Sequence, residues 1–133
     1  MPPPVHIHHL AIWTRDLEKM RGFYARYFGA ISGEKYRNET KGFESYFLCF
    51  SEGARLELMK LDHPRTASDV QVDEVIGLTH FALSVGGRDR VDALTEILRK
   101  DGFNIAGEPR ITGDGYYESV VLDPEGNRIE LTE

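Results

Sequence analysis

The sequence predicts an α+β fold in which one βαβββ module occurs twice and forms curved mixed sheets around a cleft. The prediction depends on short strings of residues that recur in the two halves of the chain in the same order. One string is His9-Leu10-Ala11-Ile12, which returns as His80-Phe81-Ala82-Leu83; the other is Arg55-Leu56-Glu57-Leu58, which returns as Arg128-Ile129-Glu130-Leu131. The spacing also repeats, because His9 and Glu57 are 48 positions apart and His80 and Glu130 are 50 apart.

The repeat sets the expected organisation of the chain. We expect a single domain over 1–133, with a first module at about 5–60, a linker at 61–77 and a second module at about 78–132. A chain of 133 residues can bury one sizeable core, and 41% hydrophobic and 29% charged residues are ordinary for a soluble globular protein.

The first module is expected to begin with a strand at 6–13, followed by an amphipathic helix. Asp16 has the side chain of an N-cap, and Gly29 is a natural stop. The apolar residues that recur at helical spacing are Leu17, Met20, Tyr24, Tyr27 and Phe28. Turn-forming residues then separate three strands, expected at about 31–38, 43–50 and 54–60.

The second module has the same expected order. A strand at 78–85 precedes a helix with Asp89 as its expected cap and Gly102 at its end. The apolar stripe of that helix consists of Val91, Leu94, Ile97 and Leu98. The last three strands are expected at 104–112, 116–122 and 128–132.

Composition and charge argue against several classes of protein. The net charge is −6 and no basic stripe is present, which argues against a nucleic-acid binder. No apolar run approaches the roughly 20 residues of a membrane span. The start, Met1-Pro2-Pro3-Pro4, lacks the features of a secretory signal, so we expect a cytoplasmic protein. The single cysteine, Cys49, stands in an apolar run and is expected to be a buried structural thiol; a catalytic role is the weaker alternative.

Strand alternation places one histidine and one glutamate of each module on the sheet face that the helix does not cover. In the first module these are His9 and Glu57, because their neighbours in the strand form the purely apolar face. In the second module they are His80 and Glu130. If the two sheets curl together, the four side chains converge in one cleft.

Two carboxylates and two imidazoles cannot share a partly buried cleft without a compensating charge, and a divalent cation supplies one. The expected site is one ion held by His9, Glu57, His80 and Glu130, with two positions left open for substrate. This donor set suits octahedral Ni, Co, Mn or Fe, or an expanded Zn site. We favour Ni or Zn, with Co, Mn or Fe as alternatives.

Each of these residues, taken alone, has a simpler interpretation. A lone strand histidine is usually structural, and a glutamate near a strand end is usually solvated. The repeat favours a metal site, because histidine is uncommon and recurs at one point of both modules together with a glutamate. Among the other histidines, His6 and His8 fall on the opposite strand face and are expected at the surface or in packing. His63, in the linker, is expected to be exposed to solvent.

These residues resemble the modules of the vicinal oxygen chelate superfamily, which includes glyoxalase I, bleomycin-resistance proteins, fosfomycin-resistance enzymes, methylmalonyl-CoA epimerase and extradiol dioxygenases. The resemblance covers nearly the whole chain. Its strongest pieces are His9 to Ile12 with Asp16-Leu17, Phe23-Tyr24 and Gly29, then Gly77 to Val85 and Leu122 to Leu131. The order His, Glu, His, Glu is similar to that of bacterial glyoxalase I in particular.

The resemblance implies paired modules, a small-molecule substrate and a homodimer. It also implies a metal-dependent lyase or isomerase of the glyoxalase I type. In such an enzyme the ion binds adjacent oxygens of the substrate, such as a hemithioacetal of an α-ketoaldehyde, and stabilises an enediolate. Glu130 or Glu57 would act as the base that moves a proton between neighbouring carbons.

Small residues beside the ligands, Ala11 and Ala82, would leave room for the substrate. The candidate pocket walls are Trp13, Met59, Tyr116 and Tyr117, for which ordinary packing is the simpler alternative. Glyoxalase I often carries an arginine four residues after its first ligand and an asparagine four residues after its second, which hold glutathione. Here those positions are Trp13 and Leu61, so the glutathione anchors are missing where the resemblance would place them.

Three other functions remain open. An epimerase of acyl-CoA thioesters would use the same enolate chemistry but needs basic residues for the phosphates of CoA. An extradiol dioxygenase would use iron with two histidines and one carboxylate, and the second carboxylate and the short chain count against it. A drug-binding or metabolite-binding resistance protein of this fold generally lacks the metal ligands, so the four ligands favour catalysis.

Overall fold

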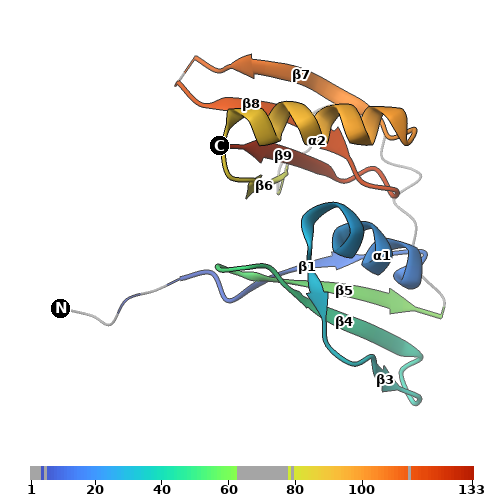
Figure 1. The fold of residues 1–133 in the computed structure, drawn as a ribbon. Coiled ribbons are helices and arrows are strands. Elements are labelled where there is room, and N and C mark those ends of the chain that lie inside the picture. Colours follow the sequence, from blue (N-terminus) through green and yellow to red (C-terminus); the bar gives the residue numbers. More distant parts are fainter. Residues whose placement is uncertain (1–3, 5, 63–77, 79, 114) are drawn as a thin grey trace. The chain divides into compact units, whose positions relative to one another are not determined.

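The computed structural model describes residues 4, 6–62, 78, 80–113 and 115–133, within two compact units, Met1–Ala67 and Ser68–Glu133. We call these units the N-terminal module and the C-terminal module. Each contains one helix and one mixed sheet, which confirms the predicted α+β class (Figure 1). His63 and residues 63–77 of the expected linker lie outside the described residues.

The N-terminal module has a mixed sheet with one helix. Its elements are β1 (His9–Trp13), α1 (Leu17–Phe28), β2 (Ile31–Ser32), β3 (Tyr36–Asn38), β4 (Phe43–Cys49) and β5 (Arg55–Leu61). The strand order is β1-β5-β4-β2, and β3 also pairs with β4. β1 runs parallel to β5, whereas the other pairings are antiparallel.

The C-terminal module repeats this plan. Its elements are β6 (Phe81–Ser84), α2 (Arg88–Lys100), β7 (Ile105–Ile111), β8 (Tyr117–Leu122) and β9 (Arg128–Thr132). The strand order is β6-β9-β8-β7, and β6 runs parallel to β9. In both modules, therefore, the first strand pairs with the last.

The predicted limits of α1 are confirmed. The Asp16 carboxylate accepts a hydrogen bond from the backbone N–H of Lys19 at 3.0 Å, and Gly29 ends the helix in the left-handed conformation at φ 66°. The buried face of α1 meets the buried face of the sheet, and the two faces supply Leu17, Met20, Tyr24, Leu48, Leu56 and Leu58. This packing leaves the opposite face of the sheet uncovered by the helix.

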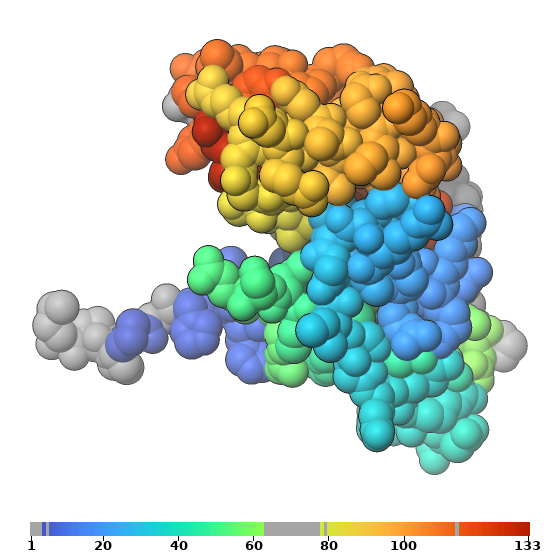
Figure 2. All heavy atoms as spheres, in the orientation of Figure 1, coloured from blue at the N-terminus to red at the C-terminus, as the bar shows by residue number. Residues whose placement is uncertain are grey.

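The predicted cap of α2 is wrong. The residue before the helix is Gly87, at φ 137°, and it makes no side-chain cap; Asp89 lies in the first turn instead. The chain enters the helix through Gly86-Gly87, so the helix begins at Arg88, two residues earlier than an Asp89 cap would allow. At its new place the carboxylate still interacts favourably with the positive end of the helix dipole. Figure 2 shows the outer side of α2, drawn in yellow to orange, on the near side of the C-terminal module.

Several predicted strands are shorter than expected. The strand expected at 31–38 is two strands, β2 and β3, which pair with different parts of β4. The strand expected at 6–13 begins at His9, because its partner β5 begins at Arg55. The strand expected at 78–85 begins at Phe81, since the pairing with β9 begins there, so His80 lies one residue before it.

Cys49 is exposed, which corrects the expectation of a buried thiol. Its neighbour Leu48 is fully buried against the helix side of the sheet. Because side chains alternate along a strand, Cys49 lies on the other face, where it pairs with Ile31 of β2. The apolar run around it therefore belongs to both faces of β4.

Within the part of the chain that the structure describes, no helix combines the length and the apolar character that crossing a membrane would require.

Candidate metal centre

Each module carries one histidine and one glutamate, and their positions in the first module match those in the second. In the N-terminal module Ala11 pairs with Glu57, and His9 lies two residues before Ala11. In the C-terminal module Ala82 pairs with Glu130, and His80 lies two residues before Ala82. His9 lies on the same side of its sheet as Glu57, because residues two apart in a strand share a face. His80 lies just before β6, and its contact with Glu130 at 2.8 Å places it on the side of that glutamate. We call this helix-free side the open face of each module.

The N-terminal pair is loosely spaced. Nε2 of His9 and Oε1 of Glu57 are 3.7 Å apart, with side-chain exposures of 39% and 16%. The His9 ring rests edge-on against Phe47, with ring centroids 5.3 Å apart. Its Nδ1 lies 2.9 Å from Nδ1 of His8, so the ring is held from two sides. His8 therefore lies beside the strand end rather than on its opposite face, because β1 begins only at His9.

The C-terminal pair is closer. Nε2 of His80 and Oε1 of Glu130 are 2.8 Å apart, with side-chain exposures of 36% and 24%. The β8–β9 turn that positions Glu130 is built around Asp123, which is 4% exposed. Its carboxylate accepts hydrogen bonds from the backbone N–H of Glu125 and of Asn127 and from Nδ2 of Asn127, at 2.8 to 2.9 Å. This turn fixes the pairing of Val120 with Glu130.

The two pairs fit adjacent ligands of a divalent ion. Each bond to such an ion is about 2.1 Å long, so neighbouring ligand atoms lie about 3 Å apart. The separation in the C-terminal pair matches this spacing, and the N-terminal pair is somewhat wider. Among the described residues, no group of three or more His, Cys, Asp or Glu side chains could hold an ion. One module by itself thus offers two ligands.

The candidate wall residues divide between the two faces. Trp13 and Met59 are register partners on the open face of the N-terminal module, and the Trp13 ring packs edge-on against Phe43 at 6.2 Å. Tyr116 is 59% exposed and lies just before β8. The Tyr117 hydroxyl donates to Asp92 of α2 at 2.5 Å, and Arg88 of α2 lies over its ring. Tyr117 is therefore directed toward the helix, away from the open face.

Two residues of the N-terminal open face were missed from the sequence. Phe47 lies directly across from Glu57, and Arg55 lies directly across from His9. Arg55 was visible as part of the repeated string, but without a known register its neighbours were unknown. Phe47 stands in an apolar run that was assigned to the core, and only the pairing of β4 with β5 places it beside the glutamate.

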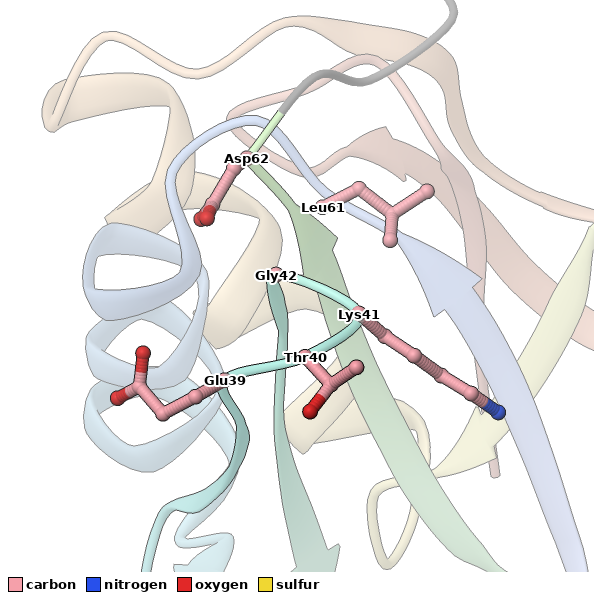
Figure 3. Close-up of a pocket in the computed structure, with 6 residues that line it drawn as sticks. All are labelled: Glu39, Thr40, Lys41, Gly42, Leu61 and Asp62. Atoms are coloured by element: carbon pink, nitrogen blue, oxygen red, sulfur yellow. The ribbon is translucent and has the colours of Figure 1, made fainter.

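A separate depression of about 430 Å³ lies at the turn between β3 and β4, lined by Glu39, Thr40, Lys41, Gly42, Leu61 and Asp62 (Figure 3). At its edge the Arg37 guanidinium hydrogen-bonds to Asp62, Glu39 and Glu44. The bond to Asp62 and then the bond to Glu39 raise the pKa of Arg37 above its ordinary value. The acidic groups and the arginine compensate one another, so we assign no function to this depression.

A family model for the Glyoxalase/Bleomycin resistance protein/Dioxygenase superfamily matches residues 6–131. The chain belongs to this superfamily. The match confirms the resemblance to the vicinal oxygen chelate proteins, a superfamily whose members commonly bind a divalent metal. It also covers both His–Glu pairs, although it leaves the activity of this member open.

Similar proteins match this chain over nearly its whole length, and the solved structures among them share its fold. The uncharacterized protein YwkD of Bacillus subtilis (strain 168) is 31% identical over 132 residues, covering 96% of this chain and 95% of YwkD. A glyoxylase/bleomycin resistance protein/dioxygenase domain from Frankia sp. EAN1pec has a TM-score of 0.80 at 18% identity, over 97% of this chain and 91% of that domain. A glyoxalase I variant from Zea mays has a TM-score of 0.74 at 23% identity, over 96% of this chain. The chain spans only 44% of that maize protein.

Proposed function

We propose that this member of the superfamily is a metal-dependent lyase or isomerase of the glyoxalase I type. One divalent ion, with Ni or Zn favoured and Co, Mn or Fe as alternatives, would be held by His9, Glu57, His80 and Glu130. One observation carries the proposal: both modules present a histidine and a glutamate close together on the open face, at equivalent positions of the repeat. Packing would explain one such pair, but it does not require the same pair twice.

The charges of the four residues suit a divalent ion. Two carboxylates neutralise it, and two neutral imidazoles add nitrogen ligands without further charge. All four side chains are partly exposed, so a substrate can reach them. When bound, the metal would stabilise negative charge on the substrate oxygens as a neighbouring carbon loses its proton.

The carboxylates would move that proton. Glu57 and Glu130 each stand across from an alanine, Ala11 or Ala82, whose small exposed side chain leaves space above the strand. A carboxylate with this access takes the proton from the carbon beside a carbonyl and returns it to the next carbon. A hemithioacetal of an α-ketoaldehyde is the substrate class that such a transfer suits.

The first experiment is a metal analysis of the protein purified without a histidine tag, beside His80→Ala. We expect about one ion per chain in the parent and less than a tenth of that in the variant, because one of four ligands is lost. The control is His6→Ala, which removes a histidine outside both pairs. A parent that holds no metal even after reloading would contradict the proposal and favour a ligand-binding protein of the same fold.

We further propose that the protein is cytoplasmic, because an exposed cysteine without an internal partner suits a reducing compartment. We also propose that it is a homodimer, which light scattering tests. Mixed dimers of His9→Ala and His80→Ala chains reveal how the ligands are shared. If each site combines modules of two chains, one site of a mixed dimer keeps all four ligands and half of the metal returns. If each site lies within one chain, none returns.

A further inference from the structure

Arg55 is an arginine beside the N-terminal pair. It lies on the open face, directly across from His9 in the parallel β1–β5 ladder. Its guanidinium carbon lies 4.4 Å from the centroid of Phe47, and the His9 ring contacts the same phenyl ring. The guanidinium is therefore held beside the candidate metal ligand by stacking on an aromatic face.

The charge of Arg55 is not compensated by a carboxylate within the described part of the chain. Its polar side-chain contact is with Nε2 of His8, at 3.3 Å. Other arginines do have acidic partners, as Arg37 has Glu44 and Asp62, and as Arg88 has Glu133. Stacking holds one face of the guanidinium, and Nη2 contacts His8; the remaining N–H groups can bind a carboxylate in a bidentate manner.

The rest of the open face shows what else the ligand would contact. Successive residues on one face of a strand are about 6.6 Å apart, so Arg55, Glu57 and Met59 form three steps along β5. The third step is apolar, because Met59 pairs with Trp13, whose side chain is 58% exposed and packs against Phe43. The face thus has a cationic end, a metal-binding centre and an apolar end.

We propose that Arg55 binds a carboxylate of the substrate, and that the substrate class is an amphipathic acid. Its carboxylate would pair with Arg55, its chelating oxygens would lie at the level of Glu57, and its apolar group would cover Met59 and Trp13. An anion in this place would also separate two positive charges, the guanidinium and the ion proposed at His9 and Glu57. The inference rests on the proposed function for its chelating oxygens, but not for its ion pair with Arg55.

The C-terminal module supplies a matched control. Arg128 occupies the position of Arg55 in the repeat, two residues before Glu130, and it is exposed. The residue across from Glu130 is Val120, so the aromatic platform of Phe47 has no counterpart there. Arg128→Met should therefore leave ligand binding unchanged, whereas Arg55→Met keeps an apolar contact with Phe47 and removes the charge.

The test uses the single tryptophan, Trp13, as a reporter of the same face. The protein is titrated with 3-phenyllactate, with its neutral methyl ester and with lactate, while tryptophan emission is recorded with and without added Ni²⁺. We expect the parent to bind 3-phenyllactate at least ten-fold more tightly than either comparison ligand. Arg55→Met should lose the preference for acid over ester, and Arg128→Met should keep it.

The outcomes separate this inference from the proposed function. An acid preference of the metal-free protein that survives in Arg55→Met, or a parent that binds none of the three ligands, would overturn the role of Arg55. Metal content measured on the same samples tests the four ligands independently. Metal-free protein that still prefers the acid through Arg55 supports the present inference even if the metal proposal fails.

Discussion

The two modules share one register but present different open faces. His9 corresponds to His80, Glu57 to Glu130 and Arg55 to Arg128. Around these shared positions, three bulky apolar residues of the N-terminal module stand where the C-terminal module has small or polar ones: Trp13 and Ser84, Phe47 and Val120, Met59 and Thr132. In terms of the proposed function, both halves would supply metal ligands, whereas the selection of the substrate would fall to the N-terminal half.

Removing one carboxylate of the pairs should have the largest effect. Glu130→Gln keeps the shape of the side chain but weakens a ligand and removes a base, so we expect turnover to fall about 100-fold or more. Both Glu130→Gln and Glu57→Gln should lower the metal content, which mass spectrometry of the purified protein measures. The control is Glu108→Gln, because Glu108 lies in β7, at the other edge of the sheet from β6, and pairs with Arg99. Unchanged metal and turnover in Glu130→Gln would break the equivalence of the two pairs.

Exchanging the wall residues should have the next largest effect. In Trp13→Ser together with Met59→Thr, the N-terminal face takes the residues of the C-terminal face. We expect affinity for a ligand with an aromatic group to fall about ten-fold, because apolar contact is lost, with metal content unchanged. Calorimetric titration with 3-phenyllactate measures the change. The reciprocal change, Ser84→Trp with Thr132→Met, should leave affinity nearly as it is; an equal effect of both exchanges would mean that the two faces share substrate binding.

The turn before the last strand distinguishes the modules in stability. Asp123 accepts three hydrogen bonds in the C-terminal turn, whereas Phe50 stands at the corresponding place before Glu57. Asp123→Ala leaves buried donors without an acceptor, so we expect a loss of about 2 kcal/mol in the free energy of unfolding. Urea denaturation checks this value, with Glu52→Ala in the N-terminal turn as the control. A loss below the error of the measurement would show that the turn does not depend on the carboxylate.

The smallest effect expected is a pH dependence of helix packing. The Tyr46 hydroxyl donates to Glu18 of α1 at 2.5 Å, and this bond is the main reason why the pKa of Glu18 lies below its ordinary value of 4.5. The contribution of ionised Glu18 to stability is therefore fully present above pH 4.5 and is lost as the pH falls through the lowered pKa. Tyr46→Phe should reduce the drop in melting temperature between pH 6 and pH 3. A parallel shift at both pH values would exclude this coupling.

The C-terminal module also has a hydrogen bond from a strand tyrosine to a carboxylate of its helix, which can be compared with the Tyr46–Glu18 bond. Tyr117 donates to Asp92 of α2, and this bond raises the pKa of the Tyr117 hydroxyl. A group whose pKa is raised on folding stabilises below its unfolded pKa and loses that stabilisation as the pH rises through the folded value. Tyr117→Phe should therefore change the melting temperature less at high pH than at neutral pH.

Local sequence signals predicted much of the fold, because they act through neighbouring residues. Asp16 and Gly29 mark the ends of α1 by their own chemistry, and the repeat of His9 and His80 located both first strands. The predictions that failed depend on partners far along the chain. Cys49 was assigned to the core because the face it lies on is decided by the pairing of β4, and the strand containing His80 was drawn too long because β9 decides where pairing begins. The surroundings of Arg55 were missed for the same reason, since the sheet alone brings Phe47 and His9 beside it.

The pairing of the first strand with the last strand in each sheet has a consequence for the order in which the chain acquires structure. β1 cannot form its parallel ladder until β5 exists, and that pairing joins residues as distant as His9 and Arg55. Contacts of such separation carry a large loop-closure entropy and slow folding. During synthesis, the first half must therefore wait until residue 61 has left the ribosome before its sheet can close. The same delay applies to the second half, whose sheet waits for β9, Arg128–Thr132.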